Sequence, residues 1–419
     1  MKNFWWWFLL AFVVPLEAQT LIAVRWWMRR YDQQGDNTIK CYLSTNAGVT
    51  WTYRGRIDSI YANDGGLGLA VISEPNLARL YFLFQPGEGG ARPTRAYYSD
   101  DTGATWHTMG TLGTWDRHDY ATAGLIAVSG GNLLAFALGT DNCLKVRYST
   151  DGGYNWLSRS DICPGYADPD PEGDMTFDET GRVYLINWQN SSPPRCYVST
   201  DWGQSWPQSA QVSSSSGSSN CRASDITYDP VTHSLFAIIW SRTINPTVYR
   251  STDRGASWGY GGTVVSDYMD GDGSAAIACD SLGNLYALLW DDYTDLRLFV
   301  STNGGASWNY RSTVAAGNAD ICACGTELVV LGAAPMGFQD YYETPFRVFV
   351  EGNRVLLDLS SPGNYSLVVY DPAGRRAKHL WEGWLAGGSH SFGLDGLDRG
   401  VYLLRIRGEG TSSVVRFVQ

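Results

Sequence analysis

This sequence has few lysines and no net positive charge. Its only lysines are Lys2, Lys40, Lys145 and Lys378, and charged residues make up 17% of its 419 positions. With 42 Asp+Glu against 31 Lys+Arg, the formal net charge is −11. This balance argues against the clustered basic surface that binds nucleic acid, so we expect no nucleic-acid partner.

Lysine is also a helix-forming residue, and residues that favour turns and strands are common in its place. The chain has 47 Gly and 16 Pro, and 14% of its residues are aromatic, including 18 Trp and 25 Tyr. So high an aromatic content excludes disorder as the main state. Together these proportions predict an all-β fold.

Apolar runs long enough to cross a membrane are absent. The longest run, residues 4–14, has 11 residues, whereas a bilayer needs about 20. Lys2 gives this segment a positive start, and Ala18 is a small residue suited to cleavage. We therefore expect residues 1–19 to be a signal peptide and the mature chain to be exported.

The eight cysteines show no zinc-like CxxC pair, so they predict no metal site. Export would allow disulfides. Pairing of Cys143 with Cys163, or of Cys196 with Cys221, is among 105 complete pairings that eight cysteines allow. Buried free thiols are the alternative, and the sequence leaves the pairing open.

One eight-residue pattern, Ser-x-Asp/Asn-x-Gly-x-x-Trp, occurs six times, with its serines 55, 50, 50, 52 and 50 residues apart. It suits a hairpin turn: the Ser and Asp/Asn oxygens accept backbone N–H bonds, the Gly takes a positive φ, and the Trp begins the outgoing strand. Because Asn replaces Asp in two copies, the position needs an oxygen acceptor rather than a charge, and we expect a structural role. The six octamers contribute Ser44, Asn46, Gly48, Trp51, Ser99, Asp101, Gly103, Trp106, Ser149, Asp151, Gly153, Trp156, Ser199, Asp201, Gly203, Trp206, Ser251, Asp253, Gly255, Trp258, Ser301, Asn303, Gly305 and Trp308.

The segments between octamers repeat too. Residues 225–229 and 235–240 resemble residues 275–280 and 285–290, with turn residues between the two runs. Each unit of about 50 residues therefore reads as four short strands, which is typical of a β-propeller blade.

The octamers resemble the Asp-box, or BNR, repeats of the sialidase superfamily of propellers. The resemblance covers residues 20–334 and implies a six-bladed β-propeller. Residues 21–30 already match a second strand, so we expect the late residues 320–324 to supply the missing innermost strand and close the ring. A seventh, degenerate blade is the alternative.

After Pro335 the repeats stop. Residues 335–345 read as a linker, and residues 346–419 predict a small antiparallel β-sandwich of immunoglobulin-like type. Segments 362–376 and 400–406 closely resemble the C-terminal sorting domains of type IX secretion substrates. That resemblance implies recognition by the secretion machinery and delivery to the surface or medium of a Gram-negative bacterium. An ordinary accessory domain is the alternative.

Acidic residues gather in the loops expected opposite the octamers, among them Asp168, Asp174 and Asp270. They suit a cation site, with Ca²⁺ the ion considered, or a carboxylate pair for glycoside hydrolysis. A solvated acidic face is the alternative, and we expect no other cofactor. Trp188, Trp240 and Trp290 each stand 11 residues before an octamer serine, where they would either stack on sugars or pack between blades.

The sialidase resemblance implies three arginines that clamp a carboxylate, a Tyr–Glu nucleophile and an Asp acid. This sequence has no Arg-Ile-Pro motif for the first arginine. The weak catalytic candidates are Arg29, Arg30, Asp36, Asp174, Arg222 and Arg242.

These features lead to one principal functional hypothesis: an exported, monomeric propeller that binds a glycan or extracellular polysaccharide. A sialidase-like exo-glycosidase is the first alternative. A protein-interaction propeller is the second.

Overall fold

The computed structural model divides the chain into two units, Met1–Gly337 and Phe338–Gln419, which we describe separately. The structure describes residues 19–27, 38–59, 65–74, 77–86, 92–115, 122–128, 131–163, 173–188, 192–214, 222–241, 243–266, 274–290, 295–316, 324–331, 346–351, 354–359, 362–371, 375–386, 388–398, 400–408 and 411–418. None of these residues lies in an α-helix, so they include no helix that could span a membrane.

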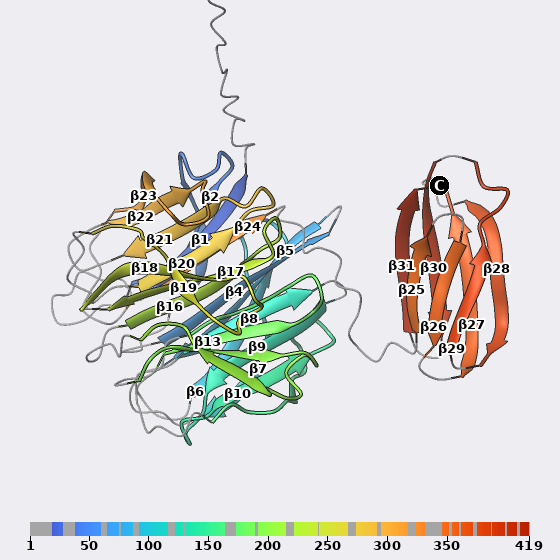
Figure 1. Cartoon of the computed structure of the whole chain (residues 1–419), viewed down its shortest axis with the longest axis horizontal. Coiled ribbons are helices and arrows are strands. Elements are labelled where there is room, and N and C mark those ends of the chain that lie inside the picture. The colour runs from blue at the N-terminus through green and yellow to red at the C-terminus, as the bar shows by residue number, and fades with distance from the viewer. Residues whose placement is uncertain are drawn as a thin grey trace, which may run out of the picture. The chain divides into compact units, whose positions relative to one another are not determined.

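The first unit consists of four-stranded antiparallel sheets, six of them in the described residues (Figure 1). We number the sheets along the chain and give their strands from the innermost outwards: the first sheet has β24 (Cys324–Leu331), β1 (Thr20–Trp27), β2 (Thr38–Ser44) and β3 (Thr52–Ser59), and the second has β4 (Gly65–Glu74), β5 (Leu77–Pro86), β6 (Arg92–Ser99) and β7 (His107–Trp115). The third sheet has β8 (Ala123–Val128), β9 (Asn132–Leu138), β10 (Leu144–Ser149) and β11 (Leu157–Ser158), and the fourth has β12 (Met175–Phe177), β13 (Val183–Asn187), β14 (Arg195–Ser199) and β15 (Gln208–Gln211). The fifth sheet has β16 (Arg222–Asp229), β17 (Ser234–Ser241), β18 (Ile244–Ser251) and β19 (Gly259–Thr263), and the sixth has β20 (Ser274–Cys279), β21 (Leu285–Trp290), β22 (Leu296–Ser301) and β23 (Asn309–Ala315).

The six innermost strands form a closed ring. Each contacts the next in the order β24, β4, β8, β12, β16 and β20, and β20 contacts β24 again. Closure depends on β24, which pairs with β1 from Thr20↔Leu331 to Trp27↔Cys324. This arrangement is consistent with a β-propeller. The prediction that a late strand completes the first sheet is confirmed, but its position was wrong: the strand runs over residues 324–331, and residues 320–323 lie outside the described part of the chain.

The cores lie between neighbouring sheets, because the second strands are covered on both faces. Every residue of β17 and β21 is buried. Between the fifth and sixth sheets, Phe236 and Trp240 pack in one cluster with Leu285 and Leu289. Each side chain of this size contributes about 1.5–3 kcal/mol when it leaves water, so these interfaces supply much of the apolar burial that holds the ring together.

All six octamers form the predicted turn. The Ser Oγ accepts a hydrogen bond from the Gly N–H at 2.8–2.9 Å. It donates to Oδ1 of the Asp or Asn at 2.7–2.9 Å. The six glycines have φ between 77° and 91°, and each Trp comes directly before the fourth strand, except that Pro207 separates Trp206 from β15. Each turn joins a third strand to a fourth, so all six lie where the innermost strands end; we call this the octamer end.

The cysteines divide between one disulfide and buried thiols. Cys143 and Cys163 form a disulfide, one of the pairings considered from the sequence. Cys196 is a free, buried thiol, so its pairing with Cys221 is wrong. Cys41 and Cys279 are also free and buried. Burial raises the pKa of Cys41 to about 12 and also raises the pKa values of Cys196 and Cys279.

The second unit contains two antiparallel sheets in its described residues. One has the order β25 (Phe346–Glu351), β26 (Arg354–Leu359), β29 (Gly388–Gly393), and the other β28 (Arg376–Leu385), β27 (Gly363–Tyr370), β30 (Val401–Gly408), β31 (Thr411–Val418). They share one hydrophobic cluster, in which Leu357 of the first sheet packs with Leu367 and Leu404 of the second.

The octamer geometry predicts that the serine hydroxyl contributes more to the free energy of unfolding than the negative charge of the aspartate does. Ser251→Ala leaves the buried N–H of Gly255 without an acceptor, so we expect a loss of about 1–3 kcal/mol in the free energy of unfolding. Asp253→Asn should cost less than about 1 kcal/mol. In the natural Asn turn, the Asn303 amide donates to Ser307 at 2.8 Å, so the neighbouring hydroxyl changes from donor to acceptor. Urea unfolding of the full chain measures both variants, and equal losses would contradict this account.

Candidate functional site

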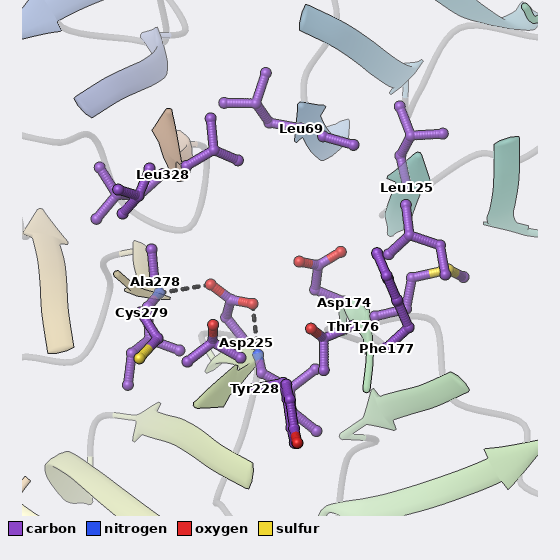
Figure 2. Close-up of a pocket in the computed structure, with 18 of the residues that line it drawn as sticks. Leu69, Leu125, Asp174, Thr176, Phe177, Asp225, Tyr228, Ala278, Cys279 and Leu328 are labelled. Atoms are coloured by element: carbon purple, nitrogen blue, oxygen red, sulfur yellow. Dashed lines mark hydrogen bonds between the residues drawn. The ribbon is translucent and has the colours of Figure 1, made fainter. Parts of the chain in front are cut away.

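A cavity of about 190 Å³ lies on the axis of the ring (Figure 2). Every innermost strand contributes to its lining. At the octamer end it reaches Glu179, Tyr228 and Pro230, and at its other end it reaches Asp174 and Asp225. Representative lining residues from the six strands are Leu69, Leu125, Met175, Ile226, Ile277 and Leu328.

Three carboxyl groups converge near the end of the cavity away from the octamers, and two of them, from Asp174 and Asp225, belong to its lining. Asp174 directly precedes β12, while Asp225 and Glu327 are each the fourth residue of their innermost strand. One oxygen from each group lies within 4.8 Å of the others. Since β24 and β12 are three places apart in the ring, Glu327 and Asp174 approach from opposite sides of the axis. We call these three residues the axial carboxylates.

The axial carboxylates are buried but differ in their hydrogen bonds. Their exposed fractions are 8% for Asp174, 5% for Asp225 and 8% for Glu327. Asp225 accepts backbone N–H bonds from Ile226 and, at 2.6 Å, from Ile277 (Figure 2). Asp174 Oδ1 is buried and accepts no hydrogen bond within the described residues.

A glycine makes the position of Asp174 possible. A Cβ on Gly124 of β8 would lie 2.6 Å from Asp174 Oδ1 and 2.3 Å from the Phe136 ring. Any larger residue would therefore displace the carboxyl group or the ring. Gly124 in the third sheet thus leaves space for the side chain of Asp174, which comes from the fourth sheet.

Burial favours the protonated forms of Asp174 and Asp225, and repulsion by neighbouring carboxylates adds to the effect at Asp174. Burial, followed by the charges of Glu327 and Asp225, raises the pKa of Asp174 well above its usual value. Burial also raises the pKa of Asp225 to about 6, although its backbone N–H partners oppose the increase. No described Lys, Arg or His forms an ion pair with either aspartate. Protons, a cation or a ligand with several donors would stabilise these two aspartates.

At the octamer end of the cavity, a Tyr–Glu pair lies at the rim. The hydroxyl of Tyr228 donates to Glu179, and His233 Nδ1 lies 2.8 Å from the same hydroxyl. Burial and the Glu179 carboxylate raise the pKa of Tyr228, which opposes the loss of its proton. Sequence reasoning missed this pair. It has the residue types of a sialidase nucleophile, but the raised pKa disfavours that role.

The three tryptophans proposed as a sugar platform are buried. Trp188 and Trp290 have 0% exposure and Trp240 has 1%. Trp188 donates its indole N–H to the carbonyl of Ser192 at 3.0 Å, and the Trp290 ring lies 5.1 Å from the guanidinium of Arg25. Their burial favours packing between sheets over stacking on a sugar.

The catalytic candidates are not brought together in the described residues. Asp174 belongs to the axial carboxylates, and the backbone of Arg222 pairs with Ser241 in the fifth sheet. The other candidates, Arg29, Arg30, Asp36 and Arg242, lie outside the described part of the chain, as do Asp168 and Asp270.

Glu327 was not among the sequence candidates, although a signal for it was present. It is a charged residue directly before the apolar run Leu328–Leu331, three residues after the late strand that the repeat pattern placed at residues 320–324. A carboxylate at such a position indicates either a hydrogen-bond network or a ligand.

The raised pKa values predict that stability falls as pH rises. Because the folded pKa of Asp225 exceeds its usual 3.8, the folded state binds its proton more tightly, and this contribution is lost between about pH 4 and above pH 6. The difference corresponds to a loss on the order of 3 kcal/mol. Asp174→Asn removes a second group whose pKa is raised in the folded state, so it should flatten the slope. Unfolding midpoints of the full chain in EDTA across this range measure the effect.

Octamer aspartates such as Asp101, whose pKa hydrogen bonds lower to about 2, change stability in the opposite direction. Their contribution is nearly complete above about pH 4, so it does not obscure this window. An identical slope in wild type and Asp174→Asn would contradict the assignment to the axial carboxylates.

No protein-family model and no curated protein sequence matches the chain. Among solved structures, the Penicillium chrysogenum α-L-arabinanase complexed with arabinobiose is 15% identical, with a TM-score of 0.46 over 70% of this chain and 88% of that one. The Aleuria aurantia lectin in complex with Fucα1-6GlcNAc is 12% identical, with a TM-score of 0.49 over 73% and 98%. A Hadza microbial sialidase is 18% identical, with a TM-score of 0.44 over 64% and 60%. These TM-scores are below 0.5, so the similarities do not decide what this chain binds.

Proposed function

We propose that the chain is an exported protein that binds glycans through a six-bladed Asp-box propeller formed by residues 20–334. Residues 346–419 form its β-sandwich sorting domain and deliver it to the surface or medium of a Gram-negative bacterium. The apolar segment at residues 4–14 and the Cys143–Cys163 disulfide support export, because disulfides persist in oxidising compartments. The two sheets around one hydrophobic cluster support the sandwich.

The observation that carries glycan binding is the position of the axial carboxylates. They converge near the end of the cavity away from the octamers, and Asp174 follows the acidic residues Asp168, Asp170 and Glu172 in the sequence. A sugar presents several hydroxyl donors, and carboxylate oxygens are strong acceptors for them. Hydrogen bonds to charged groups are worth about 1.5–3 kcal/mol, enough to orient a sugar hydroxyl that enters the cavity. The tryptophans are not part of this site because they do not line the cavity.

A second candidate function is glycoside hydrolysis. Oxygens of Asp174 and Asp225 lie within 4.8 Å, close to the roughly 5 Å separation of carboxyl groups in retaining glycosidases. The raised pKa of Asp174 suits a general acid, which must hold its proton at neutral pH. Its burial opposes this function, since a glycosidic oxygen must reach the acid.

Binding of the full chain to a glycan array, followed by calorimetry with the best ligand, tests the proposal. We expect Glu327→Gln to weaken binding about tenfold or more, because one charged acceptor is lost. Asp253→Asn removes the same charge from an octamer and should bind as wild type does. Absence of any retained glycan, or equal loss in both variants, would contradict glycan binding at this site.

Hydrolysis is distinguished with a panel of fluorogenic glycosides. Turnover by the wild type that Asp174→Asn abolishes would establish the second candidate. Glycan binding without turnover would reject it.

A further inference from the structure

We propose that the axial carboxylates, Asp174, Asp225 and Glu327, bind one Ca²⁺ on the axis of the ring. This inference goes beyond glycan binding and does not depend on it, since the ion requires only these three side chains and solvent. It assigns to the cluster a ligand that neutralises it and connects three sheets.

The spacing of the oxygens fits one central ion. Calcium–oxygen distances are about 2.3–2.6 Å, so two oxygens on the same ion lie at most about 5 Å apart. One oxygen each from Asp174, Asp225 and Glu327 meets this limit, with all separations within 4.8 Å. The side chains come from the fourth, fifth and first sheets, so they approach the axis from three directions instead of lying along one strand.

An unsatisfied oxygen independently indicates a missing ligand. The Asp174 side chain is 8% exposed, yet its Oδ1 has no hydrogen-bond partner among the described residues. Leaving a buried carboxylate oxygen without a partner is costly. Figure 2 shows the Asp174 and Asp225 carboxyl groups turned into the channel, where an ion would lie between them.

Asp225 retains the capacity to coordinate while bonded to the backbone. The N–H groups of Ile226 and Ile277 each use one acceptor position, one on each carboxylate oxygen. A carboxylate has about four such positions. These two bonds therefore fix the orientation of Asp225 and leave it free to contact an ion.

The donor set selects a hard cation. All three ligands are carboxylates, which suit Ca²⁺ and Mg²⁺, whereas Zn²⁺ prefers sites with Cys or His. Cys279 lies in the same cavity, but its thiol donates to the Asp280 carbonyl and burial raises its pKa, so it stays protonated. Three ligands from separate sheets do not impose the strict octahedron that Mg²⁺ requires, and we therefore assign Ca²⁺.

The ion would also strengthen closure of the ring. Glu327 belongs to β24, which closes the ring on β1, and Asp174 and Asp225 belong to sheets on the far side of the axis. A ligand that binds only the folded ring stabilises it in proportion to its occupancy. Calcium binding should therefore raise the unfolding temperature of the first unit.

Titration of CaCl₂ into the EDTA-stripped full chain at neutral pH, without glycan, tests the site. Calorimetry should give one Ca²⁺ per chain, and the unfolding temperature should rise with Ca²⁺ and saturate. Asp174→Asn and Glu327→Gln should each weaken binding at least tenfold. Asp253→Asn removes the same charge from an octamer turn and should bind as wild type does.

Glu327→Asp covers the case in which a neutral variant fails to fold. It keeps the charge but withdraws the oxygen by one methylene, so it should weaken Ca²⁺ binding while leaving the calcium-free chain folded. Absence of saturable binding to the wild type would overturn the proposal. So would wild-type affinity in Glu327→Gln, or an equal loss in Asp253→Asn.

These outcomes separate the ion site from the glycan proposal. Calcium binding by a chain that retains no glycan supports the ion site and rejects glycan binding. Glycan retention in EDTA, with no calcium bound at any concentration tested, rejects the ion site alone.

Discussion

The antiparallel pairing of β24 with β1 is the constraint on which the first unit depends. The five other sheets are each built from consecutive strands, but the first joins residues 20–27 to residues 324–331. The pairing brings together strands about 300 positions apart, and the loop-closure entropy must be offset by contacts that form only when the ring is complete. Its eight paired positions and the apolar clusters on either side of the first sheet supply those contacts.

Closure of the ring also brings buried carboxyl groups close together at the axis. Innermost strands that converge from six sheets bring polar side chains together wherever one interrupts an apolar run, as Glu327 and Asp225 do. Two backbone N–H groups compensate Asp225, whereas Asp174 retains an uncompensated oxygen. A closed ring therefore gathers acidic groups where water is scarce, and their ionisation favours ligands that bring positive charge or several donors.

Local features of the fold were accessible from the sequence because their causes are local. An octamer holds its own serine, acceptor and glycine, so its turn and position follow from eight residues. The closing strand was assigned to the right part of the chain but to residues 320–324, because its register is set by β1 and not by neighbouring residues. The site was harder still. Asp174 was recognised as a candidate and Glu327 was not, since their proximity exists only across the completed ring. Aromatic residues such as Trp240 fit a binding face or an interior equally well, and only burial separates the two.

The buried thiols make the redox chemistry of the chain depend on its fold. Cys41, Cys196 and Cys279 lie in or next to the first, fourth and sixth sheets, with raised pKa values, while Cys143 and Cys163 share a disulfide. Thiol–disulfide exchange requires a thiolate that can reach the bond, and burial in the closed ring prevents both ionisation and access. If a sheet opens, its cysteine thiol becomes exposed to water and its pKa falls. The exposed thiolate could then exchange with the disulfide, and the rearranged disulfide would remain after the sheet has closed again.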